Sequence, residues 1–147
     1  MAGEGRQLFC RVITPERMLF DGEVDLVIVR IVDGEIGVLV DHAPTISTAE
    51  VGDVRIHQGD ERHVFATSDG FFKVSENLVQ ILVEEAVPAA EIDVSEAEER
   101  IVEAENEFSE VSGASEGEDS DRVLEGIERR RRMGENLVRV ARTYGEG

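Results

Sequence analysis

Hydrophobic and polar residues alternate in short runs over the first 88 residues, and glycine, aspartate and asparagine separate the runs. The runs are rich in Val, Ile and Phe, and the alternation is clearest where Val79, Ile81 and Val83 share one face. Many short strands without helices between them are typical of a β-sandwich or barrel and not of a parallel sheet. The predicted strands are 7–13, 23–32, 36–40, 53–58, 63–68, 71–75 and 78–83, with a short strand near 18–20.

Three Asp-Gly pairs interrupt this series. Asp21-Gly22 and Asp69-Gly70 have the composition of hairpin turns or other tight turns, and Asp33-Gly34 makes a further turn before the run that ends at Asp-His-Ala-Pro.

The spacing of apolar residues changes after Pro88. Asp93 followed by Glu96 resembles a capping box and predicts the start of a helix, and Gly113 is a suitable end. Ala97 and Ala104 are small enough for another helix or a sheet to approach closely. The apolar stripe of this helix, at intervals of three and four residues, is Val94, Ala97, Ile101, Ala104, Phe108 and Val111.

A second helix is predicted from about 121 to 142, after a small, acidic and non-periodic segment at 112–120 that we interpret as a hinge. Gly126 and Gly134 each weaken this helix by about 1 kcal/mol relative to alanine. The pattern predicts two domains, a β domain at 1–88 and a mobile helical hairpin at 89–147 that folds on itself or opens. The apolar positions of the second helix are Val123, Ile127, Leu137, Val138 and Ala141.

The formal net charge of −18 argues against binding to nucleic acid or to anionic lipid, because both are polyanions. No apolar run is long enough to cross a bilayer, so we expect no direct insertion into lipid. Such acidity fits a salt-rich cytoplasm and equally an ordinary acidic protein from a GC-rich genome. Cys10, the one cysteine, alternates with Leu8 and Val12 and is interpreted as a small buried hydrophobic residue in a reducing compartment.

The sequence contains few signs of catalysis. His42, His57 and His63 have no metal-ligand spacing, and no phosphate-binding glycine loop or nucleophile elbow is present. Asp41-His42 leaves a carboxylate–histidine site open, although adjacent residues of an extended segment point to opposite faces.

The run Arg129, Arg130, Arg131 and Arg132 is the one concentration of basic residues. On a helix these four positions extend over more than one turn and form a collar. The arginines either pair with glutamates of the first helix when the hairpin is closed, or contact a phosphate or an acidic surface of another protein. The two kinds of contact can also be the two states of one conformational switch.

At this point the sequence resembles a known family, the epsilon subunit of the bacterial F-type ATP synthase. The resemblance covers nearly the whole chain. Its specificity lies in the order and spacing of DGEIG, HAP and DGFFKV, followed by IDVSEAEERIVEAENEF and the second helix.

The resemblance implies an antiparallel β-sandwich of about ten strands followed by a two-helix hairpin. It also implies a non-catalytic subunit at the cytoplasmic face of the bacterial plasma membrane, which takes part in proton-driven ATP synthesis. The subunit would sit in the central stalk with the gamma subunit and rest on the c-ring. It would inhibit ATP hydrolysis when its helices extend along the gamma subunit into the hexamer of alpha and beta subunits.

Individual residues can be assigned through the same resemblance. Glu35 and His42 match positions that face the c-ring, although His42 is equally explained as a loop histidine that caps its own turn. Ile92 and Asp93 match the start of an ATP-sensing motif, but Glu96 replaces the motif arginine, so we expect little or no ATP binding and no cofactor. The arginines at 129–132 are the candidate contact with the beta subunit in the extended state.

One detail of the docking loop differs from similar sequences, which often have Pro-Gly before the histidine. This chain has Val40-Asp41 there, so we expect a less rigid turn and a carboxylate next to His42. Two other functions remain as alternatives. One is a hydrolase that uses Asp41 and His42, and the other is a stand-alone ligand-binding sandwich that dimerises through its hairpin.

Overall fold

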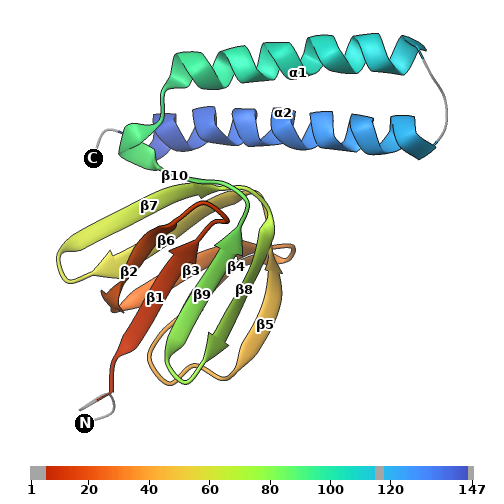
Figure 1. The fold of residues 1–147 in the computed structure, drawn as a ribbon. Coiled ribbons are helices and arrows are strands. Elements are labelled where there is room, and N and C mark those ends of the chain that lie inside the picture. Colours follow the sequence, from red (N-terminus) through yellow and green to blue (C-terminus); the bar gives the residue numbers. More distant parts are fainter. Residues whose placement is uncertain (1–5, 115–117, 146–147) are drawn as a thin grey trace. The chain divides into compact units, whose positions relative to one another are not determined.

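A computed structural model describes residues 6–114 and 118–145. The chain divides into two compact units, Met1–Pro88 and Ala89–Gly147. The first unit is a β-sandwich and the second is a pair of helices (Figure 1). In the described part of the chain the strands are β1 (Leu8–Ile13), β2 (Met18–Val24), β3 (Leu26–Ile31), β4 (Gly34–Val38), β5 (Thr45–Ala49), β6 (Gly52–Gln58), β7 (Glu61–Thr67), β8 (Gly70–Ser75), β9 (Leu78–Val83) and β10 (Ala86–Pro88).

The strands form two five-stranded sheets, which we call the first and the second sheet. The first has the order β2-β1-β9-β8-β5 and the second the order β10-β7-β6-β3-β4. All neighbouring strands are antiparallel except β1 and β9, which run parallel with Phe9 opposite Leu78. The predicted sandwich is therefore confirmed, with one parallel pair that joins its first and ninth strands.

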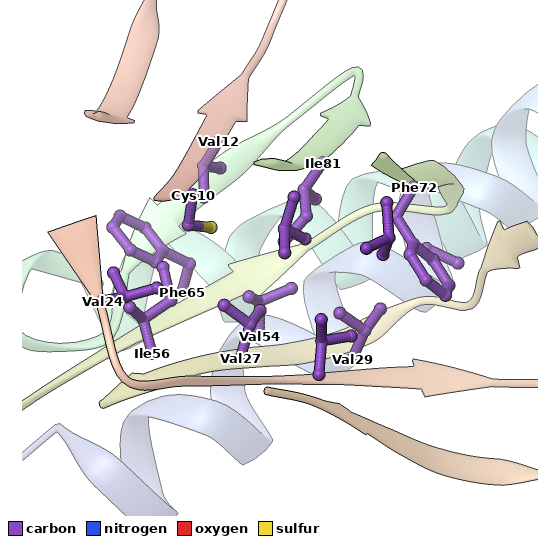
Figure 2. Packing of buried hydrophobic residues seen from close by; sticks show 14 of the residues in the cluster. Cys10, Val12, Val24, Val27, Val29, Val54, Ile56, Phe65, Phe72 and Ile81 are labelled. Atoms are coloured by element: carbon purple, nitrogen blue, oxygen red, sulfur yellow. The ribbon is translucent and has the colours of Figure 1, made fainter. Parts of the chain in front are cut away.

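The core lies between the inner faces of the two sheets (Figure 2). Val79, Ile81 and Val83 of β9 are all buried, as their alternation predicts. Cys10 is fully buried among these side chains, which confirms its interpretation as a core residue, and burial raises the pKa of its thiol to about 12. Cys10, Val12, Val24, Val27, Val29, Val54, Ile56, Phe65, Phe72 and Ile81 are labelled in Figure 2.

Two sequence predictions near the start of the chain are wrong. Asp21-Gly22 is not a turn but lies inside β2, where Asp21 pairs with Arg11 and Gly22 with Cys10. The expected strand 23–32 is divided at Asp25, whose carboxylate accepts a hydrogen bond from the Gly59 backbone N–H. An Asp-Gly pair favours a turn locally, but pairing along the whole of β1 outweighs that preference.

The strands β5 and β10 were not predicted from the pattern. The inner face of β5 carries Thr45, Ser47 and Ala49, which are too small and polar to produce a clear hydrophobic alternation. Asp69-Gly70 lies at a tight connection, as predicted, but this connection joins β7 of the second sheet to β8 of the first. Gly70 is required there, because a Cβ atom would lie 2.2 Å from the Leu82 carbonyl oxygen.

The second unit begins with a short 3-10 turn, η1 (Ala89–Glu91), and continues as α1 (Val94–Ala114) and α2 (Glu118–Tyr144). The Asp93 side chain accepts a hydrogen bond from the Glu96 backbone N–H at 3.2 Å, so Asp93 is the N-cap of α1, as predicted.

The helices are longer than the sequence pattern indicates. α1 ends at Ala114, one residue after the predicted end at Gly113, and α2 begins at Glu118, before residue 121, so most of the segment expected to be a hinge is helical. Within 112–120, residues 115–117 lie outside the described part of the chain.

The two helices pack closely along small residues. Ala97 and Ala104 of α1 are buried, as the sequence predicts for a close approach. Gly134 of α2 lies against Ala97 and Ile101 of α1, because a Cβ atom there would be 2.8 Å from Ile101 Cγ1 and 3.3 Å from the Ala97 carbonyl oxygen. Gly126 has open space around its Cα atom, so the two glycines of α2 serve different purposes.

The apolar positions of α2 are only partly as predicted. Ile127 and Leu137 are buried, and so are Met133 and Val140, which the pattern did not single out. Val123 is instead 49% exposed. No helix among the described residues is long and apolar enough to cross a membrane.

Candidate functional site

The candidate contacts of the β-sandwich lie at the two ends of β4. The hairpin from β3 to β4 turns through Val32 and Asp33, and Gly34 closes it with a backbone φ of 131°, in a region that favours glycine. Glu35 follows in β4 and forms an ion pair with Arg55 of β6. Glu35 is thus held on the outer face of the second sheet, within a wider charge cluster.

Asp53 is the centre of this charge cluster. Its side chain is 1% exposed, and its two carboxylate oxygens lie 3.2 Å from Arg55 Nε and 3.6 Å from Arg30 Nη2. A buried carboxylate requires such cations nearby, because desolvation of an unpaired charge is costly. Glu35 therefore has a fixed cation next to it and is not a freely moving surface carboxylate.

The other end of β4 leads into the loop 39–44, which contains His42. The His42 backbone N–H donates to the Leu39 carbonyl at 3.2 Å and closes a four-residue turn. Asp41 occupies the third position of this turn with a φ of 64°, the left-handed conformation that a type II turn requires. The turn therefore forms without proline or glycine at its two central positions, Val40 and Asp41, and its lower rigidity stays a prediction.

Asp41 is held by two segments that are distant in sequence. Its backbone N–H donates to Asn77 Oδ1 at 2.6 Å, and its carboxylate accepts from Asn77 Nδ2 at 3.3 Å and from Arg6 Nη1 at 2.8 Å. The hydrogen bond from Asn77, followed by that from Arg6, lowers the pKa of Asp41 below its ordinary value of 3.8. We call Arg6, Asp41 and Asn77 the Asp41 clamp.

The Asp41 clamp excludes the carboxylate–histidine pair as an acid–base site in this conformation. His42 Nδ1 lies 2.8 Å from the Ala43 carbonyl oxygen, to which it donates its proton, and Thr45 donates to the same oxygen at 2.9 Å. No hydrogen bond between Asp41 and His42 occurs in the described residues. The prediction that His42 caps its own turn agrees with this geometry, and the residue is only partly buried.

Glu35 and His42 do not form one compact site. Glu35 is the second residue of β4, and Val38 is its last, so about 10 Å of strand already separate Glu35 from the start of the loop. β4 is an edge strand of the second sheet, with one side unpaired. The two residues therefore mark the ends of one exposed edge.

The arginine run is divided among different partners. Arg130 crosses to α1 and forms a bidentate ion pair with Glu107, with the shorter contact at 2.5 Å. Arg131 stays within α2, where it binds Glu128 at 2.8 Å and Glu135 at 2.9 Å. The hydrogen bonds to these arginines lower the pKa of Glu107 and of Glu128.

The two remaining arginines, Arg129 and Arg132, are exposed and make no ion pair with the described residues. The prediction that the arginines pair with the first helix is thus confirmed for Arg130 alone. At the start of the same helix, Asp93 caps the helix next to Ile92, and Glu96 lies in the first turn.

Sequence reasoning missed an apolar surface on the outer face of the first sheet. Phe9, Ile46 and Phe71 are 42%, 74% and 52% exposed. Phe9 and Phe71 point outward because Leu8, Cys10 and Phe72 next to them lie in the core, and Ile46 points away from the half-buried Thr45 and Ser47. An open groove of about 340 Å³ lies next to Phe71. It is lined by Ile13, Pro15, Leu82 and Val83 among others.

The signal for this surface was present in the sequence. In β1 and β8 an apolar residue also occupies the outward position, as in Leu8-Phe9-Cys10 and Phe71-Phe72. Single exposed hydrophobic residues are normal on a protein surface, and only several of them gathered on one face indicate contact with a partner.

Comparison with known proteins places these features in a family. The family described as "ATP synthase, Delta/Epsilon chain, beta-sandwich domain" matches residues 7–89. The "ATP synthase epsilon chain" of Rubrobacter xylanophilus is 67% identical over 147 residues, which is the full length of both chains. The corresponding chain of a Synechococcus strain is 32% identical over 84% of this chain and 92% of its own.

A solved structure agrees with these sequence matches. A chain in the mitochondrial ATP synthase of Euglena gracilis, described as "OSCP/F1/c-ring in rotational state 1", has a TM-score of 0.68 and 25% identity. The match covers 89% of this chain and 79% of that one.

Proposed function

Because the chain belongs to the epsilon-chain family of ATP synthase, we propose that it works in the central stalk, between the c-ring and the catalytic head. The observation that carries this proposal is the full-length identity of 67% to a curated epsilon chain, which includes the hairpin as well as the sandwich. The chain is a non-catalytic subunit of that complex. Its part is to transmit rotation and to regulate hydrolysis.

The outer face of the first sheet is the proposed contact with the gamma subunit. Phe9, Ile46 and Phe71 expose large apolar side chains there, and Phe71 lines an open groove that can accept a side chain of a partner. Buried apolar anchors in such pockets dominate the energy of protein interfaces. The contact must persist during rotation, which favours a large, rigid and apolar surface.

The β4 edge is the proposed contact with the c-ring. Glu35 and His42 stand at its two ends, and Val32 and Leu39 are exposed next to them. Laying this edge along the ring brings both candidate residues to the ring together, although they are separated within the fold. Through this contact the subunit would lie peripherally at the membrane, on the cytoplasmic side in bacteria.

The helical hairpin is the proposed regulatory element. In the conformation described here α1 and α2 pack together, and Arg130 is paired with Glu107. When the helices separate and extend between the alpha and beta subunits, Arg130 is released to join Arg129 and Arg132. The arginine run would then contact an acidic surface of the beta subunit and inhibit ATP hydrolysis.

We further propose that the closed hairpin binds ATP weakly or not at all. Asp93 is engaged as the N-cap of α1, and Glu96 brings a negative charge to the first turn, where a phosphate would otherwise be attracted. Isothermal titration of the chain with ATP should give no binding in the micromolar range. A micromolar dissociation constant would contradict this interpretation of Ile92, Asp93 and Glu96.

Reconstitution tests the whole proposal. The chain should bind a complex of alpha, beta and gamma subunits, and failure to bind any complex that contains gamma would refute the central-stalk function. Such a failure would instead favour a stand-alone ligand-binding sandwich. Replacement of Phe71 by serine should weaken this binding, while serine in place of the exposed Val123 of α2 should leave it unchanged.

A truncated chain tests the regulatory part. Removal of the residues after 111 should raise ATP hydrolysis by the reconstituted complex and leave its assembly intact. Replacement of Arg129 and Arg132 by glutamine should produce part of the same increase. Glutamine in place of Arg122, an exposed arginine of α2 outside the run, is the matched control and should have no effect.

A further inference from the structure

The turn that carries His42 is held by groups outside it. Type II turns favour proline at the second position and glycine at the third, where φ is positive. Here these positions are Val40 and Asp41, and Asp41 has a φ of 64°. Aspartate adopts this conformation more readily than most residues, but neither residue restricts the chain to it. The local sequence alone therefore does not account for a single conformation of the turn.

The Asp41 clamp supplies the missing restraint. Asn77 forms two hydrogen bonds with Asp41, one with its backbone and one with its side chain, and Arg6 binds the second carboxylate oxygen. Asn77 is itself fixed in the hairpin between β8 and β9, where Glu76 and Asn77 both have positive φ, as a type I′ turn requires. Its carbonyl also accepts a hydrogen bond from Phe9 of β1 at 2.8 Å.

The clamp thus ties the 39–44 loop to the hairpin between β8 and β9 and to the segment that precedes β1. Three hydrogen-bonding groups of Asp41 are used: its backbone N–H and both carboxylate oxygens. In the same loop Leu39 is 58% exposed and His42 is half-buried, so the loop carries both an apolar and a polar residue that a partner can contact.

We infer that Arg6, Asp41 and Asn77 are positioning residues, which hold the 39–44 loop in one conformation ready to contact the c-ring. This inference rests on the proposed function, because the ring is the partner assigned to the β4 edge. A loop that is already ordered loses no conformational entropy on binding. The affinity of a mobile loop is instead reduced in proportion to the fraction of molecules that have the binding-competent conformation.

Three variants of the full chain separate the clamp from general stability. Asn77→Gly removes the side-chain contacts but keeps the positive φ of the hairpin. Glu76→Gly changes the neighbouring residue of the same hairpin and leaves the clamp intact, so it is the matched control. Val40→Pro with Asp41→Gly, added to Asn77→Gly, supplies residues that favour the turn by themselves and should make the clamp unnecessary.

Two measurements are made on each variant. Hydrogen–deuterium exchange of the 39–44 peptide reports the order of the loop, and binding to purified c-ring in nanodiscs reports its function. Asn77→Gly should increase deuterium uptake in this peptide and weaken ring binding about tenfold, the effect of reducing the competent fraction to about one tenth. The control should match the wild-type chain, and the triple variant should regain both properties.

The outcomes distinguish the clamp from the proposed function. A wild-type chain that does not bind the ring would refute the ring contact, and the docking role of the clamp with it. If the wild-type chain binds the ring and Asn77→Gly binds it equally well, the ring contact stands but the positioning role of the clamp is refuted. This holds whether or not the loop becomes mobile. Weaker binding without recovery in the triple variant would also overturn it, because the loss would then come from another effect of the substitution.

Discussion

Substitution of Gly134 by alanine tests the close packing of the two helices. Alanine is the better helix former, so propensity alone predicts a gain of about 1 kcal/mol at any interior glycine of α2. Gly126 provides the matched control, since it lies in the same helix with open space around its Cα atom. A difference between the two variants measures the contact with α1 and not the propensity.

The structure gives the size of that difference. A Cβ atom at residue 134 would lie 2.8 Å from Ile101 Cγ1 and 3.3 Å from the Ala97 carbonyl oxygen. Ile101 is β-branched and cannot easily rotate away, and the carbonyl belongs to the backbone of α1. Overpacking of this kind costs about 1–3 kcal/mol. Gly134→Ala should therefore destabilise the hairpin by about 0–2 kcal/mol, whereas Gly126→Ala stabilises it by about 1 kcal/mol.

Hydrogen exchange of backbone amides in α1 and α2 measures the free energy of hairpin opening. The free energies of hairpin opening in the two variants should differ by about 1–3 kcal/mol. Because 1.4 kcal/mol corresponds to a factor of ten, exchange should be about 5- to 150-fold faster in Gly134→Ala than in Gly126→Ala. Adding Ile101→Ala to Gly134→Ala should recover part of the loss, since it removes the clashing Cγ1 atom.

Equal stabilisation by the two alanine variants would refute the close approach of the helices. Equal destabilisation would mean that α2 tolerates no added methyl group anywhere, and the specific contact of Gly134 with Ile101 would also be wrong. A lack of recovery in the double variant would leave the clash itself without support.

Four further predictions concern charge and burial. The pKa of Asp41 is lowered in the folded chain, so the ionised carboxylate stabilises the fold fully above pH 3.8, and this contribution is lost as pH falls through the lowered pKa. Backbone chemical shifts of the 39–44 loop should change in that pH range. The same changes in Asp41→Asn would show that another group causes them. A double-mutant cycle on Arg130 and Glu107 should give a coupling close to zero, because both side chains are largely exposed and water screens the pair; a strong coupling would exceed what such an exposed pair explains. The Cys10 thiol, with a pKa of about 12, should react with thiol reagents only when the sandwich unfolds; fast labelling under native conditions would show that it is not buried. The melting temperature should rise between low and molar salt because a net charge of −18 repels itself, and a constant melting temperature would rule out that repulsion as a limit on stability.

The sandwich was predictable from the sequence because its inner faces follow simple alternation. Val79, Ile81 and Val83 predict both the strand and the buried face. The pattern failed at β5, because its inward residues Thr45 and Ser47 are small and polar and resemble a loop in composition. It also failed at Asp21-Gly22, because pairing with β1 is a long-range effect that a local turn signal does not contain.

The candidate site was predictable only in its residues and not in its contacts. HAP and DGEIG identified the loop and the hairpin, but the ties from Asp41 to Arg6 and Asn77 join segments about 35 residues apart, which no short motif contains. The role of Gly134 was likewise invisible, since in sequence it resembles Gly126. Only the register of α2 on α1 distinguishes them.

The parallel pairing of β1 with β9 sets the order in which the chain can mature on the ribosome. β1 is made first but lies between β2 and β9, so its second neighbour is absent until residue 83 has left the exit tunnel. Contacts so far apart in sequence form slowly, and domains fold as units during synthesis. The sandwich therefore completes itself only as the hairpin is being translated. The contacts between α1 and α2, by contrast, join segments that are close in sequence and can form as soon as both helices have been released.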